Sequence, residues 1–345
     1  MTRADPGRRS IGVEEELLLV QPGTGRPAAR SAAAIAALTP ETDVVLGVAG
    51  AYRLWVRGAS RTSLLDVAAD LAAGRSAADG AARAAGARAV ALAASPLGKD
   101  GLGALDLESP RLVCGLRIEV TLGSLPGPAA IAALQPWLPV LLALSTNSPF
   151  SDGRDTGLAS SRAARAAHLL DRGVGVPRAG RCEGPTEPVV AVRVADVCLD
   201  QHAGVTLAAL VRAVLDAADD RGAPSRGLPA SVHRAALQRA ASDGLAATLV
   251  DPATGRACAT YDVADRLFQH VRTVLGEDEH AVRVGLERIV NDGAGADVQR
   301  RLLRDLRLPS AAIERVADAT QCVHRGPAGP QHLSTPVLVD LPIAG

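Results

Sequence analysis

Aromatic residues and lysine are almost absent from this 345-residue chain. Phe, Trp and Tyr together make up 2% of the residues, so the core must be built from Ala, Val and Leu, which the 48% hydrophobic content supplies. Lys99 is the only lysine, and every other basic side chain is an arginine. The formal net charge is +0. This balance argues against binding to nucleic acid or to an anionic membrane, because both need a basic excess.

The chain also lacks a cysteine framework and a long uninterrupted apolar run. Its 5 cysteines are scattered and form no C-x-x-C pair, which favours reduced thiols in a cytoplasmic protein. No apolar run reaches about 18 residues without a charge or a proline, so we expect no membrane span. The segment "RRSIG" (8–12) is similar to a twin-arginine signal, but glutamates follow where the apolar region of a signal would stand, so we reject that interpretation.

Residue patterns predict an α+β fold. Four segments read as strands: 11–20, 51–60, 110–120 and 188–198. Four stretches have helical spacing: 62–94, 127–150, 202–220 and the whole of about 229–322. Residues 171–188 are rich in Gly, Pro and Arg and predict a loop. Strands separated by long helices and followed by a helical block indicate an α+β architecture.

We expect one domain over residues 1–322. Its sheet-bearing part would be 11–198 and its helical part 199–322. Residues 323–345 are rich in Pro and Gly and predict a loosely attached tail.

Three consecutive glutamates interrupt the first predicted strand. Strand alternation places Glu14 and Glu16 on one face and Glu15 on the other. Burying like charges side by side costs several kcal/mol for each unless something positive compensates them. Glu14 and Glu16 therefore bind a cation or pair with arginine, and we expect Glu15 to cap an edge or to pair with an arginine.

Four segments, taken in order, resemble the glutamate–cysteine ligase type 2, or carboxylate–amine ligase, family. They are "GVEEELLLVQPGTGRP" (12–27), "LLALSTNSPFSDGRDTGLASSR" (141–162), "VVAVRVADVC" (189–198) followed by "LAALVRAVL" (207–215), and "GLAATLVDPATGR" (244–256) with "GAGADVQR" (293–300). The resemblance implies a glutamine-synthetase-like antiparallel sheet that forms an open cradle for ATP, divalent metal, glutamate and an amine. It also implies ligation through a γ-glutamyl phosphate.

The resemblance assigns roles to particular residues. Glu14 and Glu16 match the metal ligands of the family's first strand. Arg193 matches an arginine that contacts phosphate or substrate, and a structural role for it stays open; we take Arg193 and Glu119 as the candidate catalytic residues. The candidate cofactor-binding residues are Arg117, Arg162 and Arg193. For an active enzyme, the resemblance implies ATP and Mg²⁺ as cofactors.

Several positions depart from the family pattern. Arg57 stands where active relatives carry a glutamate, and Ala191 replaces another glutamate. Arg117 and Glu119 occupy two histidine positions. The matched positions thus hold three glutamates against three arginines, Glu14, Glu16 and Glu119 against Arg57, Arg117 and Arg193. An arginine about 4 Å from a metal position repels each unit of the ion's charge by about 4 kcal/mol at an effective dielectric of about 20.

Arginine is therefore the expected compensation for the glutamates, in place of metal. Arg57 and Arg117 would face the same side of the sheet as Glu14 and Glu16 and could pair with them. We favour a salt bridge between Glu119 and Arg57. Metal ligation by the two glutamates, and a role of Glu119 as a replacement ligand, stay open as alternatives.

The remaining motifs indicate structure more than chemistry. The segment "SDGRDTG" (151–157) has the Asp and Gly residues of a turn, and we expect it to shape the rim of the cradle. "GAGAD" (293–297) follows no strand and is not a dinucleotide fingerprint. The seven histidines show no metal-binding spacing.

Three functions fit this sequence. The first is a pseudoenzyme without cofactor that acts as a partner or regulator of an active ligase paralogue, with the self-association that is typical of the family. The second is an active ATP-dependent carboxylate–amine ligase with a rearranged site, in which arginines neutralise phosphate charge. The third is a binder of a small anionic ligand in an arginine-lined cradle. Tight, metal-dependent binding of Mg²⁺–ATP would contradict the first.

Overall fold

The chain folds around a seven-stranded sheet in which β1 is the central strand. The computed structural model describes residues 8–38, 44–97, 112–151, 154–165, 173–175, 187–221 and 228–321. The strand order is β2-β3-β1-β5-β9-β8, with β4 also paired to β1, and every pairing is antiparallel. The strands of this sheet are β1 (Ile11–Val20), β2 (Val45–Val48), β3 (Arg53–Arg57), β4 (Arg88–Val90), β5 (Leu116–Thr121), β8 (Val174–Gly175) and β9 (Val189–Val192).

The two halves of β1 have different surroundings. In its second half, Leu17, Leu18 and Leu19 are all fully buried, because other elements pack on both faces of the sheet there. In its first half, Glu14 and Glu16 are only partly buried, whereas Glu15 between them is fully buried. One face of the sheet is therefore open to solvent where the two outer glutamates lie.

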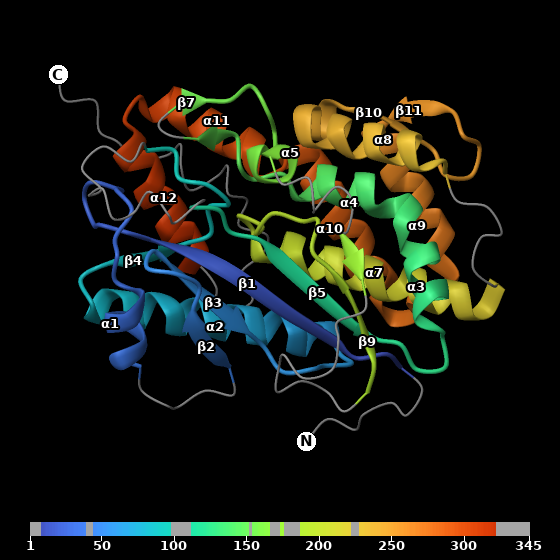
Figure 1. Ribbon diagram of the computed structural model, residues 1–345, viewed down its shortest axis with the longest axis horizontal. Helices are drawn as coiled ribbons and strands as arrows, with labels where there is room; N and C mark the ends of the chain where they lie inside the picture. Colours follow the sequence, from blue (N-terminus) through green and yellow to red (C-terminus); the bar gives the residue numbers. More distant parts are fainter. Residues whose placement is uncertain are drawn as a thin grey trace.

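The opposite face of the sheet carries α2 (Leu64–Ala84) and α7 (Gln201–Arg221), which contact β1 and β5 respectively (Figure 1). Further helices pack around α7 and form one apolar core with the sheet. They are α3 (Gly127–Leu134), η2 (Gln135–Trp137), α4 (Leu138–Ser145), α8 (Ala230–Asp243), η3 (Gly244–Ala246), α9 (Thr260–Leu275), η4 (Gly276–Asp278) and α10 (Glu279–Asp292).

A second apolar core joins the other end of the sheet to the C-terminal helices. There α11 (Gly295–Leu306) packs on α12 (Pro309–Gln321), and α12 contacts β4 and α2, at the left of Figure 1. The remaining elements are α1 (Ser31–Ala36), α5 (Ser161–Arg165), the hairpin of β6 (Phe150–Ser151) with β7 (Arg154–Asp155), and the hairpin of β10 (Thr248–Val250) with β11 (Ala257–Ala259). The α+β architecture expected from the sequence, an antiparallel sheet flanked by helices with a mostly helical C-terminal part, is confirmed.

Three predicted elements need correction. The helix expected over 62–94 ends at Ala84, and β4 follows because it pairs with β1. The segment 127–150 is not one helix: Pro136 lies in η2, and Pro139 lies in the first turn of the new helix α4, where a proline is tolerated. The block 229–322 contains the β10–β11 hairpin. Most of the predicted loop 171–188 and the tail 323–345 lie outside the described residues.

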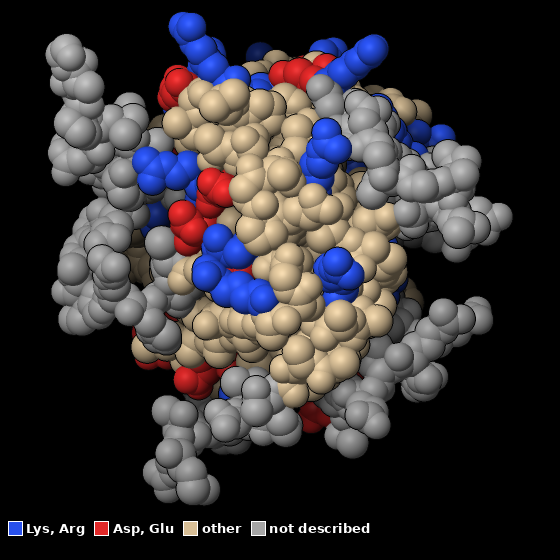
Figure 2. All heavy atoms as spheres, turned by 90° about the vertical axis from the view of Figure 1, so that its left-hand side faces the viewer, with Lys and Arg blue, Asp and Glu red and all other residues tan. Residues whose placement is uncertain are grey.

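The segment Gly127–Ser145 is long and apolar enough to cross a membrane by composition alone. However, 67% of its most apolar window is buried inside the protein, so it occupies the place of a core helix. The view from the left of Figure 1 shows arginine and carboxylate side chains close together among neutral residues (Figure 2). This mixed face agrees with the expectation of no nucleic-acid or membrane partner, which stays a prediction.

The twin arginines of "RRSIG" fasten the N-terminal segment to the helices. Arg9 is buried, and its Nη1 lies 2.5 Å from Asp216 Oδ1 on α7. Arg8 pairs with Asp278 in η4, a carboxylate that also lies 2.5 Å from Arg212. These contacts give the two arginines a structural role.

Candidate functional site

The sheet register brings the charged residues of three strands together. Glu14 on β1 lies opposite Arg57 on β3 and, on its other side, opposite Arg117 on β5. Glu119 lies two residues further along β5, on the same face as Arg117. Its neighbours across the sheet are Gly12 and Ala191. We call Glu14, Glu16, Arg53, Arg57, Arg117 and Glu119 the cradle cluster.

Glu119 is held by two arginines. Arg57 Nη2 lies 2.5 Å from Glu119 Oε2, and Arg117 Nη2 pairs with the other oxygen, Oε1. The side chain of Glu119 is 8% exposed, and those of Arg57 and Arg117 are 16% and 17% exposed. The expected salt bridge between Glu119 and Arg57 is therefore present. The catalytic role of Glu119 and the cofactor-binding role of Arg117 stay predictions.

Glu14 is compensated less well than Glu119. Its ion pair with Arg57 joins Glu14 Oε2 to Nη1 at 3.9 Å, which is beyond hydrogen-bonding distance. Burial raises the pKa of Glu14 above its ordinary value, and the neighbouring Arg117 and Arg57 offset this only in part. The carboxylate lies among arginines without a close hydrogen bond from either of them in the described structure.

Glu16 pairs with a residue that the sequence pattern did not single out. Arg53 Nη1 lies 3.1 Å from Glu16 Oε1, and the backbone N–H of Gly115 donates to Oε2 at 3.0 Å. The expectation that Arg57 or Arg117 would pair with Glu16 is thus wrong. Arg53 lies four residues before Arg57 on β3, so strand alternation places both on one face, and this signal was available in the sequence.

Glu15 lies on the opposite face and is fully buried. Arg75 from α2 binds it with two hydrogen bonds, 2.8 Å from Nε to Oε2 and 2.6 Å from Nη2 to Oε1. Arg75 also donates to the carbonyl oxygens of Cys198 and Leu199 at 2.7 and 3.1 Å. The expected arginine partner of Glu15 is present, and it fastens β1 to α2 and to the segment before α7.

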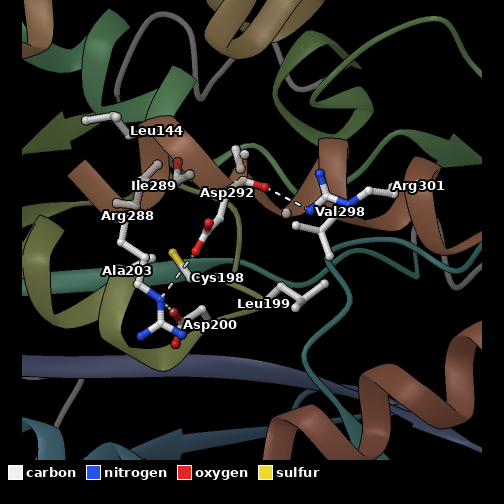
Figure 3. Close-up of a pocket in the computed structure, with 14 residues that line it drawn as sticks. Leu144, Cys198, Leu199, Asp200, Ala203, Arg288, Ile289, Asp292, Val298 and Arg301 are labelled. Carbon is white, nitrogen blue, oxygen red and sulfur yellow. Dashed lines mark hydrogen bonds and ion pairs between the residues drawn. The ribbon is translucent and has the colours of Figure 1, made fainter. Parts of the chain in front are cut away.

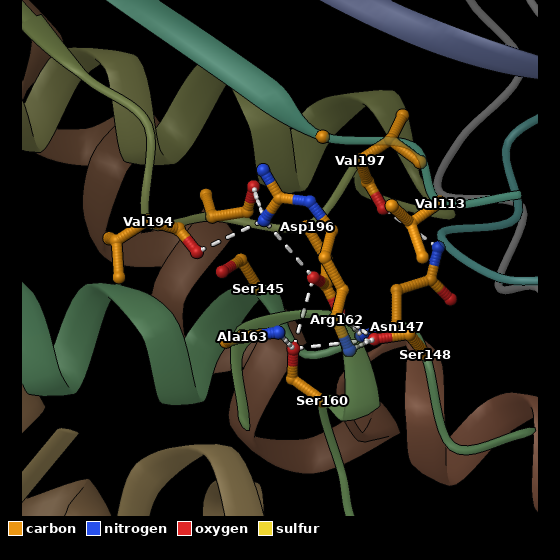
Figure 4. A network of polar contacts seen from close by, with 12 residues as sticks. Val113, Ser145, Asn147, Ser148, Ser160, Arg162, Ala163, Val194, Asp196 and Val197 are labelled. Atoms are coloured by element: carbon orange, nitrogen blue, oxygen red, sulfur yellow. Dashed lines mark hydrogen bonds and ion pairs between the residues drawn. The ribbon is translucent and has the colours of Figure 1, made fainter. Parts of the chain in front are cut away.

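Arg162 lies in α5, and its guanidinium donates to backbone carbonyl oxygens of the segment that follows β9 (Figure 4). Its Nη1 donates to the carbonyl oxygen of Ala195 at 3.0 Å and lies 3.4 Å from the Asp196 carboxylate. Its Nη2 donates to the carbonyl oxygen of Arg193 at 3.2 Å. The side chain of Arg193 is exposed, directly after the last residue of β9. The cofactor-binding roles of Arg162 and Arg193, and the catalytic role of Arg193, stay predictions.

The segment "NSPFSDGRDTGLASSR" surrounds a buried carboxylate. Asp196 is fully buried and accepts hydrogen bonds from Asn147 N at 2.8 Å, Ser148 Oγ at 2.7 Å and Ser160 Oγ at 3.0 Å (Figure 4). Burial raises the pKa of Asp196 despite these donors. The described part of the expected rim turn is fastened by Asp155, which makes two hydrogen bonds to Arg300 at 2.9 and 2.8 Å. These contacts give the segment an architectural role.

A separate pocket lies behind the sheet (Figure 3). Its empty volume, open mouth included, is about 520 Å³, and it lies between the ends of α4 and α10 and the starts of α7 and α11. Arg288 lies between Asp200 at 3.2 Å and Asp292 at 3.8 Å, and Arg301 donates to the carbonyl oxygen of Asp292. The sequence pattern did not point to this pocket, and its charged groups bind one another.

The cradle cluster does not fit Mg²⁺. The ion prefers an octahedral set of oxygen ligands, but here each of the three carboxylates faces an arginine within 4 Å. Each arginine would repel the dication. Among the residues that the structure describes, no group of three or more His, Cys, Asp or Glu side chains is arranged to hold a metal.

The sheet and its flanking helices place the chain in the class of proteins with a glutamine-synthetase-like fold, as the sequence resemblance implied. The chain superposes on a glutamate–cysteine ligase from Francisella tularensis in complex with AMP, with a TM-score of 0.64 and 13% identity, covering 91% of this chain and 89% of that one. It also superposes on PafA, the ligase of the prokaryotic ubiquitin-like protein Pup, with a TM-score of 0.60, 15% identity and coverage of 91% and 72%.

Sequence comparison narrows the class to one family. The model of the glutamate–cysteine ligase family 2 (GCS2) matches residues 10–179 and 184–328. A protein of Streptomyces coelicolor named "Putative glutamate–cysteine ligase 2" is 34% identical, covering 86% of this chain and 94% of its own. One of Paenarthrobacter aurescens named "Putative glutamate–cysteine ligase 2-1" is 32% identical, covering 93% and 97%. The chain belongs to the glutamate–cysteine ligase family 2.

Proposed function

We propose that this protein keeps the ligase fold, does not carry out Mg²⁺–ATP-dependent ligation, and acts by binding, as a partner or regulator of an active ligase of its family. The observation that carries the proposal is the contact of Arg57 and Arg117 with the two oxygens of Glu119. Phosphoryl transfer depends on positioned charge, most of it supplied by metal ions. A cluster in which arginines neutralise the carboxylates does not supply that arrangement.

The contrast between the cradle and its scaffold supports the proposal. The Asp196 network and the Glu15–Arg75 pair are buried, and their carboxylates are fully hydrogen-bonded. Polar groups at such buried positions are costly to disturb. A chain that retains this scaffold and carries arginines in the cradle is suited to presenting a ligase-shaped surface. The free thiols of Cys114 and Cys198 support the further proposal of a cytoplasmic location.

The direct test incubates the protein with glutamate, cysteine, ATP and Mg²⁺ and measures γ-glutamylcysteine and ADP. A catalytically active family member serves as positive control. We expect no product, and in calorimetry no binding of ATP that depends on Mg²⁺, measured by titrations with and without the ion. Turnover within about tenfold of the active control would refute the proposal and support an active carboxylate–amine ligase with a rearranged site.

The partner role has its own test. An active glutamate–cysteine ligase of the same family and the same cell is mixed with an excess of this protein. We expect a complex in gel filtration and a change in the kcat or KM of the ligase. Two separate elution peaks together with an unchanged kcat and KM of the active ligase would refute the partner role. They would not bear on the proposed loss of ligase chemistry.

A further inference from the structure

The cradle cluster has hydrogen-bond donors that its own carboxylates do not use. An arginine carries five N–H donors. Arg117 Nε is buried and has no partner among the described residues. Arg57 Nη1 lies 3.9 Å from Glu14, too far for a hydrogen bond. Two guanidinium groups thus hold one carboxylate, and each keeps donor capacity on the face of the sheet that is open to solvent.

The sheet sets the backbone positions of these two arginines. Arg57 and Arg117 come from strands on either side of β1, and both lie opposite Glu14 in the register of the sheet. The residues opposite Glu119 are Gly12 and Ala191, which carry no side chain beyond Cβ. Paired guanidinium groups held in this way match the several oxygens of a carboxylate or phosphate.

We propose that the cradle cluster is a metal-independent site for a small oxyanion, a phosphate or a carboxylate, which Arg57 and Arg117 hold and for which Glu119 is the resident competitor. The proposal rests on the proposed function, because arginines in the cradle exclude the metal that would otherwise bind the anion. The carboxylate of Glu119 contacts one nitrogen, Nη2, of each arginine. The unused N–H groups donate to the oxygens of the incoming anion, which shares the arginines with Glu119 or displaces it.

The test titrates metal-stripped protein with inorganic phosphate and, separately, with glutamate, by calorimetry. Metal is removed on a chelating resin, because a soluble chelator is itself a polyanion and would compete. We expect saturable binding of at least one probe, and the preferred probe identifies the source of the oxyanion. Glu119→Gln removes the competing charge and keeps its shape, so affinity should rise by about tenfold or more.

Removal of a donor should have the opposite effect. Arg117→Ala should weaken binding by about tenfold or more. The matched control is Arg239→Ala, which removes one exposed ion pair on α8 and should leave affinity unchanged. If Arg117→Ala does not fold, Arg117→Lys keeps the charge without the planar fork and should also bind less tightly.

The inference is overturned if neither the native protein nor Glu119→Gln binds phosphate or glutamate. It is also overturned if the Arg117 variants bind as tightly as the native protein. Such a result leaves the loss of ligase chemistry intact, because that part of the proposed function fails only on ligase turnover or on binding of ATP that depends on Mg²⁺. The two failures are therefore distinguishable.

Discussion

Replacing Arg57 with alanine tests whether an arginine stabilises the carboxylates of β1 and β5 where a ligase would use a cation. The guanidinium lies 2.5 Å from Glu119 and 3.9 Å from Glu14. Removing one partner of a buried ion pair costs about 3–5 kcal/mol. Here Arg117 still holds Glu119, and the side chain of Arg57 is partly exposed. We therefore expect a smaller loss in the free energy of unfolding, about 2–3 kcal/mol.

The assay compares thermal and urea unfolding of the native protein, Arg57→Ala and the control Arg239→Ala. At about 2 °C for each kcal/mol, Arg57→Ala should lower Tm by about 4–6 °C. Arg239→Ala breaks an exposed pair and should change the free energy of unfolding by less than about 1 kcal/mol. Millimolar Mg²⁺ should restore part of the Tm of Arg57→Ala only, because the vacated position then leaves carboxylates free to bind a cation.

A double variant separates the ion pair from other effects of the substitution. If the loss comes from the reduced compensation of the Glu119 charge, Glu119→Gln in the Arg57→Ala background should cost less than the sum of the two single changes. Contacting charged residues have coupling energies of about 0.5–3 kcal/mol. An unchanged Tm for Arg57→Ala, or strictly additive effects in the double variant, would refute compensation by Arg57.

Three further predictions concern the scaffold. Arg75→Ala should cost about 3–5 kcal/mol in urea unfolding, because it leaves Glu15 buried and unpaired, and a smaller loss than for Arg57→Ala would contradict this. Gly115→Ala should displace the Arg162 guanidinium, which lies against the position of the added methyl, and cost about 1–3 kcal/mol; an unchanged Tm would show that the arginine moves freely. Burial lowers the pKa of His233, so as the pH falls below about 6.5 the unfolded chain binds the proton more readily and the free energy of unfolding falls. Urea titrations between pH 7 and 5 should show this contribution in the native protein and not in His233→Leu. Equal slopes of the free energy of unfolding against pH in the two proteins would contradict it.

Local patterns were enough to predict the charged strand and its two faces. β1 has the same bounds as the predicted strand 11–20, and the opposite orientation of Glu15 follows from alternation alone. The pairing of Glu119 with Arg57 joins residues of two strands that are not adjacent in the sheet. It was predicted because the family resemblance placed both in one cradle.

Nonlocal pairing explains what the sequence did not reveal. β4 is only 3 residues long, follows an alanine-rich helix and becomes a strand through its register with β1, where Leu18 lies opposite Val90. Arg75 lies in that same alanine-rich helix, where an isolated arginine is typical of a solvated face. Its burial depends on Glu15 from another element. The β10–β11 hairpin was missed for a different reason. Asp251, Pro252 and Gly255 are local turn signals, and the helical interpretation of this block did not use them.

Arginines compensate the glutamates on both faces of β1, but they do so more completely on one face than on the other. On the helical face, Arg75 donates two hydrogen bonds to Glu15 and two more to backbone carbonyl oxygens. On the cradle face, a donor of Arg117 is buried and unused, and Glu14 has no close partner among the described residues. If these arginines replaced a metal only to stabilise the fold, the unused donors and Glu14 would be expected to hydrogen-bond within the protein, as Arg75 and Glu15 do on the helical face. Donors left open beside a floor of Gly12 and Ala191 are arranged instead for an oxygen-bearing ligand that the chain itself does not supply.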